Sequence, residues 1–245
     1  MNAQYKLPFS IVISLAVDAL TSRKRSFRED ALACVGGLKP PLRIIEKENV
    51  PAGGPCVVTV NHYYRPGFFA GWIALAIAAT VPVEMHWVVT GELLYLGKLG
   101  SPISRWALKR IGNTYGFTTM PPMPPRLQDI EARAKSVKKV LKLLKQTGNT
   151  VLGLAPEGAD QRGGKLSMPP SGAGRFGLLL AGLGSMFVPV GVYEAGGALC
   201  VHFGPAYRLS VPSGLSADEK DRAAAEVMIK HIAFLLPEEL RGDFA

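Results

Sequence analysis

Short apolar runs alternate with longer helical patterns along this 245-residue chain, and this alternation restricts the fold more than any other feature of the sequence. β-branched and aromatic residues dominate the short runs, whereas the longer segments carry apolar residues at helical spacing. Strands that alternate with helices are typical of an α/β domain with a mainly parallel sheet flanked by helices. The predicted strands are residues 42–45, 56–60, 85–90, 150–154, 187–193 and 199–203, and the predicted helices are 69–79, 103–111, 127–146, 172–183 and 217–236.

Residues 1–40 differ from the rest of the chain in composition. An apolar run at 7–20 is followed by four basic residues between positions 23 and 28 and then by Gly36-Gly37. No stretch reaches the roughly 18 to 20 uninterrupted apolar residues that a membrane-spanning helix needs. An apolar run with a basic flank is typical of an interfacial anchor, although an ordinary first helix packed on the domain fits equally well. We therefore expect a membrane-contacting segment at 1–40 and an α/β domain at 41–245.

The formal net charge of +9 favours an anionic partner, such as nucleic acid, an anionic membrane surface or a substrate that carries phosphate or CoA. The aromatic-basic motifs of RNA-binding sheets are absent from the sequence, so no nucleic acid partner is expected. The lysines of the predicted helix at 127–146 form either a solvated face or a surface for anionic lipid head groups. Cys34, Cys56 and Cys200 are widely separated, which predicts neither a disulfide framework nor a zinc site.

The strand at 56–60 places Asn61 and His62 at its carboxyl end, just before Pro66-Gly67 turns the chain. Ligands of open α/β sheets bind outside the carboxyl ends of the strands, so an imidazole at this point is a candidate general base. A histidine that caps the strand or bonds a turn is the alternative. The strand at 150–154 also ends in a polar loop, which begins Pro156-Glu157-Gly158.

Taken in order, Asn61-His62, Pro156-Glu157-Gly158 and the Val188-Pro189-Val190 strand resemble motifs of the glycerolipid acyltransferase family, which acylates lysophosphatidic acid. The family's first motif is Asn-His, four residues, then Asp; its third is Phe-Pro-Glu-Gly-Thr-Arg; its fourth is a Val-Pro strand. The resemblance covers about residues 57–207. It implies the fold of these acyltransferases and transfer of an acyl group from acyl-CoA or acyl carrier protein to a lipid hydroxyl in phospholipid biosynthesis.

The resemblance also implies roles for individual residues. His62 would be the base that removes the proton of the acceptor hydroxyl, which is a poor nucleophile until that proton is taken. Glu157 would be a second catalytic residue that lines the acceptor site. The acyl thioester is a substrate, and neither a metal ion nor a bound cofactor is expected. The residues predicted to bind substrate are Asn61, Arg65, Gly158, Arg162 and Lys165, of which Asn61 would also hold the turn.

Two of these motifs depart from the family pattern. Gly67 stands where the family has its Asp, which orients the histidine ring, and Ala159-Asp160 stands where it has Thr-Arg. The carboxylates considered as substitutes for the Asp are Glu157, Asp160, Glu92 and Glu84, with the first two favoured because the third-motif loop should face the first. The family associates this third-motif Arg, and another in its second motif, with the glycerol phosphate, and the corresponding region at 112–119 also has no Arg. The missing arginines predict an acceptor other than lysophosphatidic acid. Arg162, Lys165, Arg126 and Arg65 are the cations considered in their place.

Two hypotheses of different classes follow. The first is an O-acyltransferase at the cytoplasmic face of a membrane, peripheral or monotopic, that acylates a lysolipid or another lipid hydroxyl. The second, which Gly67 favours, is a catalytically impaired protein of the same fold that binds lipid or acyl chains as an accessory module. Separately, Gly172-Ala173-Gly174 opens a predicted helix, either as an anion cradle or to let that helix pack closely on the sheet.

Overall fold

The computed structural model describes residues 5–93, 97–122, 126–159 and 162–245. Within these residues seven strands form one sheet in the order β1-β7-β6-β2-β5-β3-β4. Neighbouring strands pair in parallel, apart from β6 and β7, which are antiparallel. The strands are β1 Arg43–Ile45, β2 Cys56–Val60, β3 Met85–Thr90, β4 Thr118–Met120, β5 Val151–Leu154, β6 Met186–Ala195 and β7 Ala198–Phe203.

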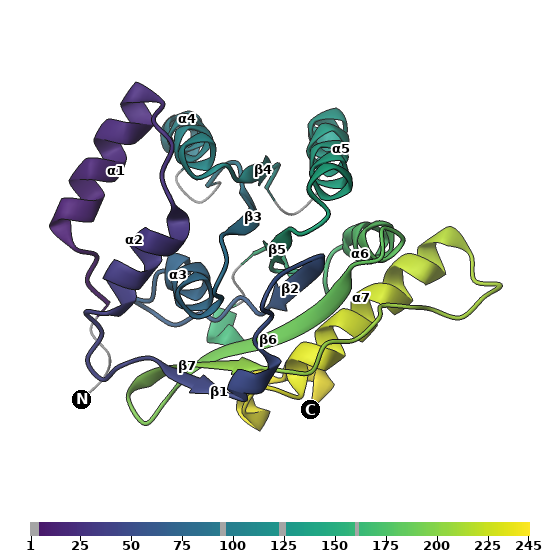
Figure 1. Ribbon diagram of the computed structural model, residues 1–245. Helices are drawn as coiled ribbons and strands as arrows, with labels where there is room; N and C mark the ends of the chain where they lie inside the picture. Colours follow the sequence, from purple (N-terminus) through teal and green to yellow (C-terminus); the bar gives the residue numbers. More distant parts are fainter. Residues whose placement is uncertain (1–4, 94–96, 123–125, 160–161) are drawn as a thin grey trace.

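Helices cover both faces of the sheet, with α1 to α4 on one side and α5 to α7 on the other (Figure 1). Among the described helices, none is both long enough and apolar enough to cross a membrane. The α-helices are α1 Phe9–Thr21, α2 Phe27–Val35, α3 Gly71–Thr80, α4 Gly97–Tyr115, α5 Ile130–Thr147, α6 Ala173–Ala181 and α7 Ala217–Ala233, and short 3-10 turns include η1 Lys47–Asn49, η3 Leu127–Asp129, η4 Arg162–Gly164, η5 Glu238–Leu240 and η6 Gly242–Phe244.

The central strand β2 is buried along its whole length. Successive side chains of a strand point to opposite faces, so β2 contributes to two cores. Val58 and Val60 belong to the cluster that includes Trp72 of α3, whereas Val57 belongs to the cluster that includes Val140 of α5 and Met228 of α7. Burial on both faces explains why the sequence of β2 is continuously apolar instead of alternating.

The structure confirms the predicted fold class, a mainly parallel sheet flanked by helices. The pattern does not reveal α2 or the three-residue strand β4. Phe27, Ala31 and Cys34 of α2 lie in the core cluster on the α3 side, and Ser26 caps the helix by accepting from the main-chain N–H of Glu29. The segment at 1–40 is therefore divided, because α2 is part of the domain core while α1 has only one buried residue, Ala19.

The helix predicted at residues 127–146 has apolar residues at helical spacing, but they are only partly buried. Val140 and Leu144 of α5 are in the core, but Leu127 is 89% exposed and Ile130 is 61% exposed. The neighbouring edge strand β4 is only three residues long, so it gives the first turn of α5 little surface to pack on. Apolar spacing therefore does not correspond to burial at this end of the helix.

Gly174, in the first turn of α6, allows close packing of α6 on α7. A Cβ on Gly174 would lie 1.9 Å from the carbonyl oxygen of Asp221 in α7, so this glycine lets α6 approach α7 closely and not, as predicted, the sheet. The main-chain N–H groups of Gly172 and Arg175 each donate to the Asp221 carboxylate at 2.6 Å. A carboxylate from the protein itself thus occupies the anion position at this helix N-terminus.

Candidate active site

The carboxyl ends of neighbouring strands bring the predicted motifs together at one edge of the sheet. Because β2 lies between β6 and β5, the loops that follow β2 and β5 are direct neighbours. Asn61-His62 follows β2, Pro156-Glu157 follows β5, and Glu194 lies near the end of β6. The expectation that the first and third motif loops face each other is confirmed.

A buried carboxylate joins these two loops. Glu157 is 3% exposed; its Oε2 accepts the main-chain N–H of His62 at 2.8 Å and its Oε1 accepts that of Ser167 at 2.9 Å. Burial raises the pKa of Glu157, and the hydrogen bonds from His62 and Ser167 counteract part of that rise. Glu157 therefore fixes the main chain of His62, so its role in this geometry is to position that residue.

The same two loops touch again through their main chains. Gly164 has a φ of +68°, and a Cβ on it would lie 2.5 Å from the carbonyl oxygen of Tyr64. Only glycine allows both this backbone conformation and this close approach. The first motif is thus held against the third-motif loop at two successive points, His62 and Tyr64.

Asn61 continues the sheet after β2 has ended. Its side-chain Nδ2 donates to the carbonyl of Val192 at 2.9 Å, and its Oδ1 accepts the N–H of Val192 at 2.7 Å. Val190 is the last residue of β6 that pairs with β2, and Val192 lies two residues beyond it. The side-chain amide of Asn61 thus takes the place of a main-chain partner for Val192. Asn61 is 1% exposed. It ties the chain after β2 to β6, and its predicted roles in holding the turn and in binding substrate stay predictions.

The loop after His62 ends in a tight turn. The N–H of Phe68 donates to the carbonyl of Arg65 at 3.1 Å, and Gly67 within this turn has a φ of +79°. The Arg65 guanidinium forms an ion pair with Glu194, through Nε and also through Nη2 at 2.8 Å. In the structure Arg65 is therefore engaged by an acid of β6, and anion binding by it remains a prediction.

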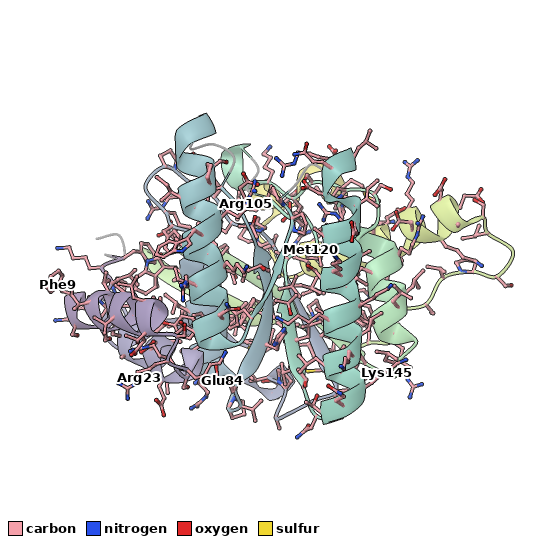
Figure 2. All side chains as sticks on the ribbon, turned by 90° about the horizontal axis from the view of Figure 1, so that it is seen from above. Phe9, Arg23, Glu84, Arg105, Met120 and Lys145 are labelled. Atoms are coloured by element: carbon pink, nitrogen blue, oxygen red, sulfur yellow. The ribbon has the colours of Figure 1, made fainter. Side chains whose placement is uncertain are left out.

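The other acids considered as substitutes for the family's Asp lie elsewhere or outside the description. Glu84 directly precedes β3, so it lies at the amino-terminal ends of the strands, away from His62. There it accepts from Ser26 Oγ at 2.7 Å and from the Phe27 N–H at 3.0 Å. Figure 2 shows Glu84 and Arg105 towards opposite ends of the molecule. Asp160 lies outside the described residues.

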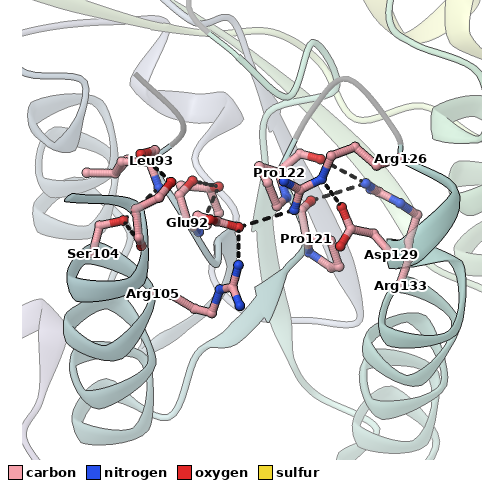
Figure 3. Close-up of polar contacts among 11 residues, drawn as sticks. Glu92, Leu93, Ser104, Arg105, Pro121, Pro122, Arg126, Asp129 and Arg133 are labelled. Carbon is pink, nitrogen blue, oxygen red and sulfur yellow. Dashed lines mark hydrogen bonds and ion pairs between the residues drawn. The ribbon is translucent and has the colours of Figure 1, made fainter. Parts of the chain in front are cut away.

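Glu92, at the end of β3, belongs to a separate charged cluster (Figure 3). Its buried carboxylate accepts from Arg105 at 2.9 Å and from Arg126 at 3.2 Å. Burial would raise the pKa of Glu92, but these hydrogen bonds outweigh it, so the pKa lies below its ordinary value. Arg126 also pairs with Asp129 at 2.5 Å, and Arg133 donates to the carbonyls of Pro121 and Pro122. Arg126, considered above as an anion-binding cation, is thus paired with two carboxylates.

The remaining predicted residues lie on the third-motif loop. Gly158 has a φ of +72° and donates its N–H to the carbonyl of Ala155 at 3.1 Å, so it forms a turn. Lys165 is exposed. Arg162 begins η4, and its side chain lies outside the described residues. Substrate binding by these three residues stays a prediction.

Sequence reasoning missed Glu194 and Ser167. Glu194 follows directly on the predicted strand at 187–193, so the reasoning that singled out His62 and Glu157 as the polar residues after apolar strands would also have found it. Ser167 has no such signal, because its main-chain N–H makes the contact. Within the described ranges, no three His, Cys, Asp or Glu side chains gather as a metal site would require.

Two neighbouring glycines test the contact between the motif loops. Gly164→Ala places a Cβ against Tyr64, whereas at Gly163, with a φ of +83°, a Cβ meets nothing within 4 Å. Both changes carry a backbone cost of roughly 1–2 kcal/mol, and Gly164→Ala should lower the free energy of unfolding by about 1–3 kcal/mol more through overpacking. Denaturant unfolding measures both values, and equal losses would contradict the close approach of the loops.

Comparisons with known proteins agree with the fold and with the family that the motifs predicted. The solved structure of the 1-acyl-sn-glycerophosphate (LPA) acyltransferase PlsC from Thermotoga maritima is similar to this chain, with a TM-score of 0.51 and 13% sequence identity over 94% of this chain and 83% of that one. A comparison with curated protein sequences gave no match. The sequence model of the acyltransferase family matches residues 41–193. Because that match covers more than half of the 245 residues, this chain belongs to the acyltransferase family, as its motifs predicted.

Proposed function

We propose that this protein transfers an acyl group from acyl-CoA or acyl carrier protein to the hydroxyl of a lysolipid or another lipid, with His62 as the general base. The observation that carries the proposal is the meeting of the two motif loops, in which the buried Glu157 carboxylate holds the main chain of His62 at 2.8 Å. The similar structure, PlsC, is that of an acyltransferase for 1-acyl-sn-glycerophosphate, which supports a lysolipid acceptor.

The proposed reaction needs one base and no covalent intermediate on the protein. The His62 imidazole takes the proton of the acceptor hydroxyl while the oxygen attacks the thioester carbonyl carbon. The carbon–sulfur bond then breaks, the ester forms, and the proton held by His62 passes to the leaving thiolate. His62 is only partly exposed, and its main chain is fixed by Glu157, so the ring starts from a defined position, which favours this proton transfer.

The acceptor is proposed to lack the phosphate of lysophosphatidic acid. The third motif has Ala159-Asp160 in place of the family's Thr-Arg. Two of the cations considered as replacements are already paired within the protein, Arg65 with Glu194 and Arg126 with Glu92. Lysolipids whose head groups carry no phosphate are therefore the first acceptors to assay.

Membrane association is the second part of the proposal. The solvent-facing side of α1 is apolar along its length. A helix that packs only on a domain core instead carries polar residues on its solvent-facing side. Exposed Arg23 follows this helix, and α4 adds exposed Ile103 and Trp106. An exposed apolar surface with a basic flank fits an anionic membrane surface at its cytoplasmic face. The exposed apolar residues of α1 and the segment before it are Leu7, Phe9, Val12, Ile13, Val17 and Leu20.

His62→Ala tests the chemistry. A general base contributes roughly 10²–10⁴-fold, so the rate of thiol release from acyl-CoA with a panel of lysolipids should fall by that factor. His202→Gln is the control, because His202 contacts the carbonyl of Leu235 and lies on β7. Release that is as fast in His62→Ala as in the unchanged protein would refute the enzymatic function and favour the accessory lipid-binding alternative.

Gly67→Asp tests whether the site has decayed. The φ of +79° makes any side chain costly at Gly67 by roughly 1–2 kcal/mol, and the heavy atom nearest to an added Cβ is Nη1 of Arg65 at 3.9 Å. An Asp would therefore compete with Glu194 for Arg65. We expect the acyl transfer rate of Gly67→Asp to be no higher than that of Gly67→Asn, which has a similar shape and tolerates a positive φ similarly but carries no charge. A rate far above that of the unchanged protein would instead indicate a decayed site.

A charge on the exposed face of α1 tests the membrane contact. Ile13 is 49% and Val17 is 52% exposed, so Ile13→Glu combined with Val17→Glu should leave the fold intact. Binding to vesicles rich in anionic lipid should fall about tenfold or more, because each buried apolar side chain contributes roughly 1.5–3 kcal/mol. Phe234→Glu, at a residue 75% exposed beyond α7, is the matched control. Equal binding by both variants in co-sedimentation would exclude α1 as the contact.

A further inference from the structure

Four residues from three distant parts of the chain meet at the carboxyl edge of the sheet beside the first motif. We call Tyr5, Tyr63, Arg65 and Glu194 the Glu194 cluster. Glu194 Oε1 accepts from the Tyr5 hydroxyl at 2.6 Å and from Arg65 Nη2 at 2.8 Å, while Oε2 accepts from the Tyr63 hydroxyl at 3.0 Å and from Arg65 Nε. One carboxylate thus ties the segment before α1 and the loop after His62 to β6.

The charge of Glu194 is held by these donors. Its side chain is 14% exposed, and that of Arg65 is 33% exposed. Burial would raise the pKa of Glu194, but the hydrogen bonds from Arg65, Tyr5 and Tyr63 outweigh it and keep the pKa below its ordinary value. Losing one partner would leave the others buried with an unmet hydrogen bond, so the cluster acts as a unit.

Aromatic packing adds to these hydrogen bonds. The Tyr5 ring meets the Phe68 ring edge-on at 5.0 Å between centroids and the Trp72 ring at 5.4 Å. The Tyr63 ring also meets the Phe68 ring edge-on, at 5.1 Å between centroids. The guanidinium of Arg65 lies 5.6 Å from the centre of the Tyr5 ring, within the range of a cation–π contact. One end of the loop, Tyr63, is therefore part of the cluster, and the other end, Phe68, packs against it.

Strand β6 consequently holds the first motif on both sides of His62. Val192 pairs with the side chain of Asn61 just before the histidine, and Glu194 holds Arg65 just after it. Glu157, in the loop that follows the neighbouring strand β5, holds the main chain of His62 itself. The family places an Asp at the position of Gly67, whereas in this chain the same turn is anchored through Arg65, two residues earlier.

We propose that Glu194 is a positioning residue for His62, and that through Tyr5 it makes the segment before α1 part of the support of the catalytic loop. The proposal rests on the proposed function of His62. It assigns Arg65 to the support of the loop instead of to the substrate. It also places the membrane-facing helix α1 four residues from an anchor of the active site, because α1 begins at Phe9.

Glu194→Gln is the main test, with Asp30→Asn as its matched control. Asp30 in α2 is also a buried carboxylate that accepts from an arginine and a tyrosine, Arg25 at 2.8 Å and Tyr115 at 2.7 Å. We expect Glu194→Gln to lower kcat by roughly 10- to 100-fold with little change of KM for acyl-CoA, since displacement of a catalytic group is costly in rate. Asp30→Asn should lower the melting temperature similarly and leave kcat near its original value.

Hydrogen exchange of the intact protein gives a readout that does not depend on activity. Glu194→Gln should speed exchange in residues 62–69 and 5–8, and Tyr5→Phe, which keeps the ring, should do so to a smaller extent. His62→Ala should leave this exchange unchanged. If the unchanged protein lacks acyl transfer but Glu194→Gln loosens these residues, the proposed function fails while the anchoring stands. Unchanged exchange, or a kcat loss no greater than in Asp30→Asn, would overturn the proposal.

Discussion

A single buried carboxylate determines the geometry of the candidate active site. Glu157 is placed where a charge is tolerated only if hydrogen bonds compensate for the lost hydration. The donors are main-chain N–H groups of His62 and Ser167, which belong to two different loops. Both loops must therefore be in place before the carboxylate is satisfied. The hydrogen bonds of Glu157 thus do two things: they hold the two loops together, and they fix the position of the predicted base, His62.

Strand β6 has a role that its motif alone does not indicate. As the Val-Pro strand it pairs with β2 and fills the core, but beyond the paired region it presents Val192 and Glu194 to the first motif. Departures from the family pattern are consistent with this arrangement. Gly67 provides a turn with positive φ, and Arg65 supplies the charged contact of the loop, so the loop after His62 is fixed without an acid at the family's position.

The fold class and the pairing of the two motifs were predictable because they depend on local patterns. The apolar runs at 56–60 and 85–90 correspond to β2 and β3, and Ser216 caps α7 with a complete capping box. The exposure of Leu127 could not be predicted, because periodicity does not tell which turns of a helix have a surface to pack on. Helix α2 was missed for the converse reason, since its sequence is of mixed polarity and its burial depends on α3.

By itself the sequence determined which residues lie at the carboxyl ends of the strands, because alternating strands and helices require a parallel sheet whose strand ends share one edge. That was enough to select His62 and Glu157 and to indicate the family. Only the tertiary structure decided what each side chain does there. Glu157 supports the main chain of His62, Asn61 completes the sheet, and Arg65 pairs with Glu194, 129 residues away. Such pairings depend on strand order and register, which bring distant residues into contact and which no local pattern specifies.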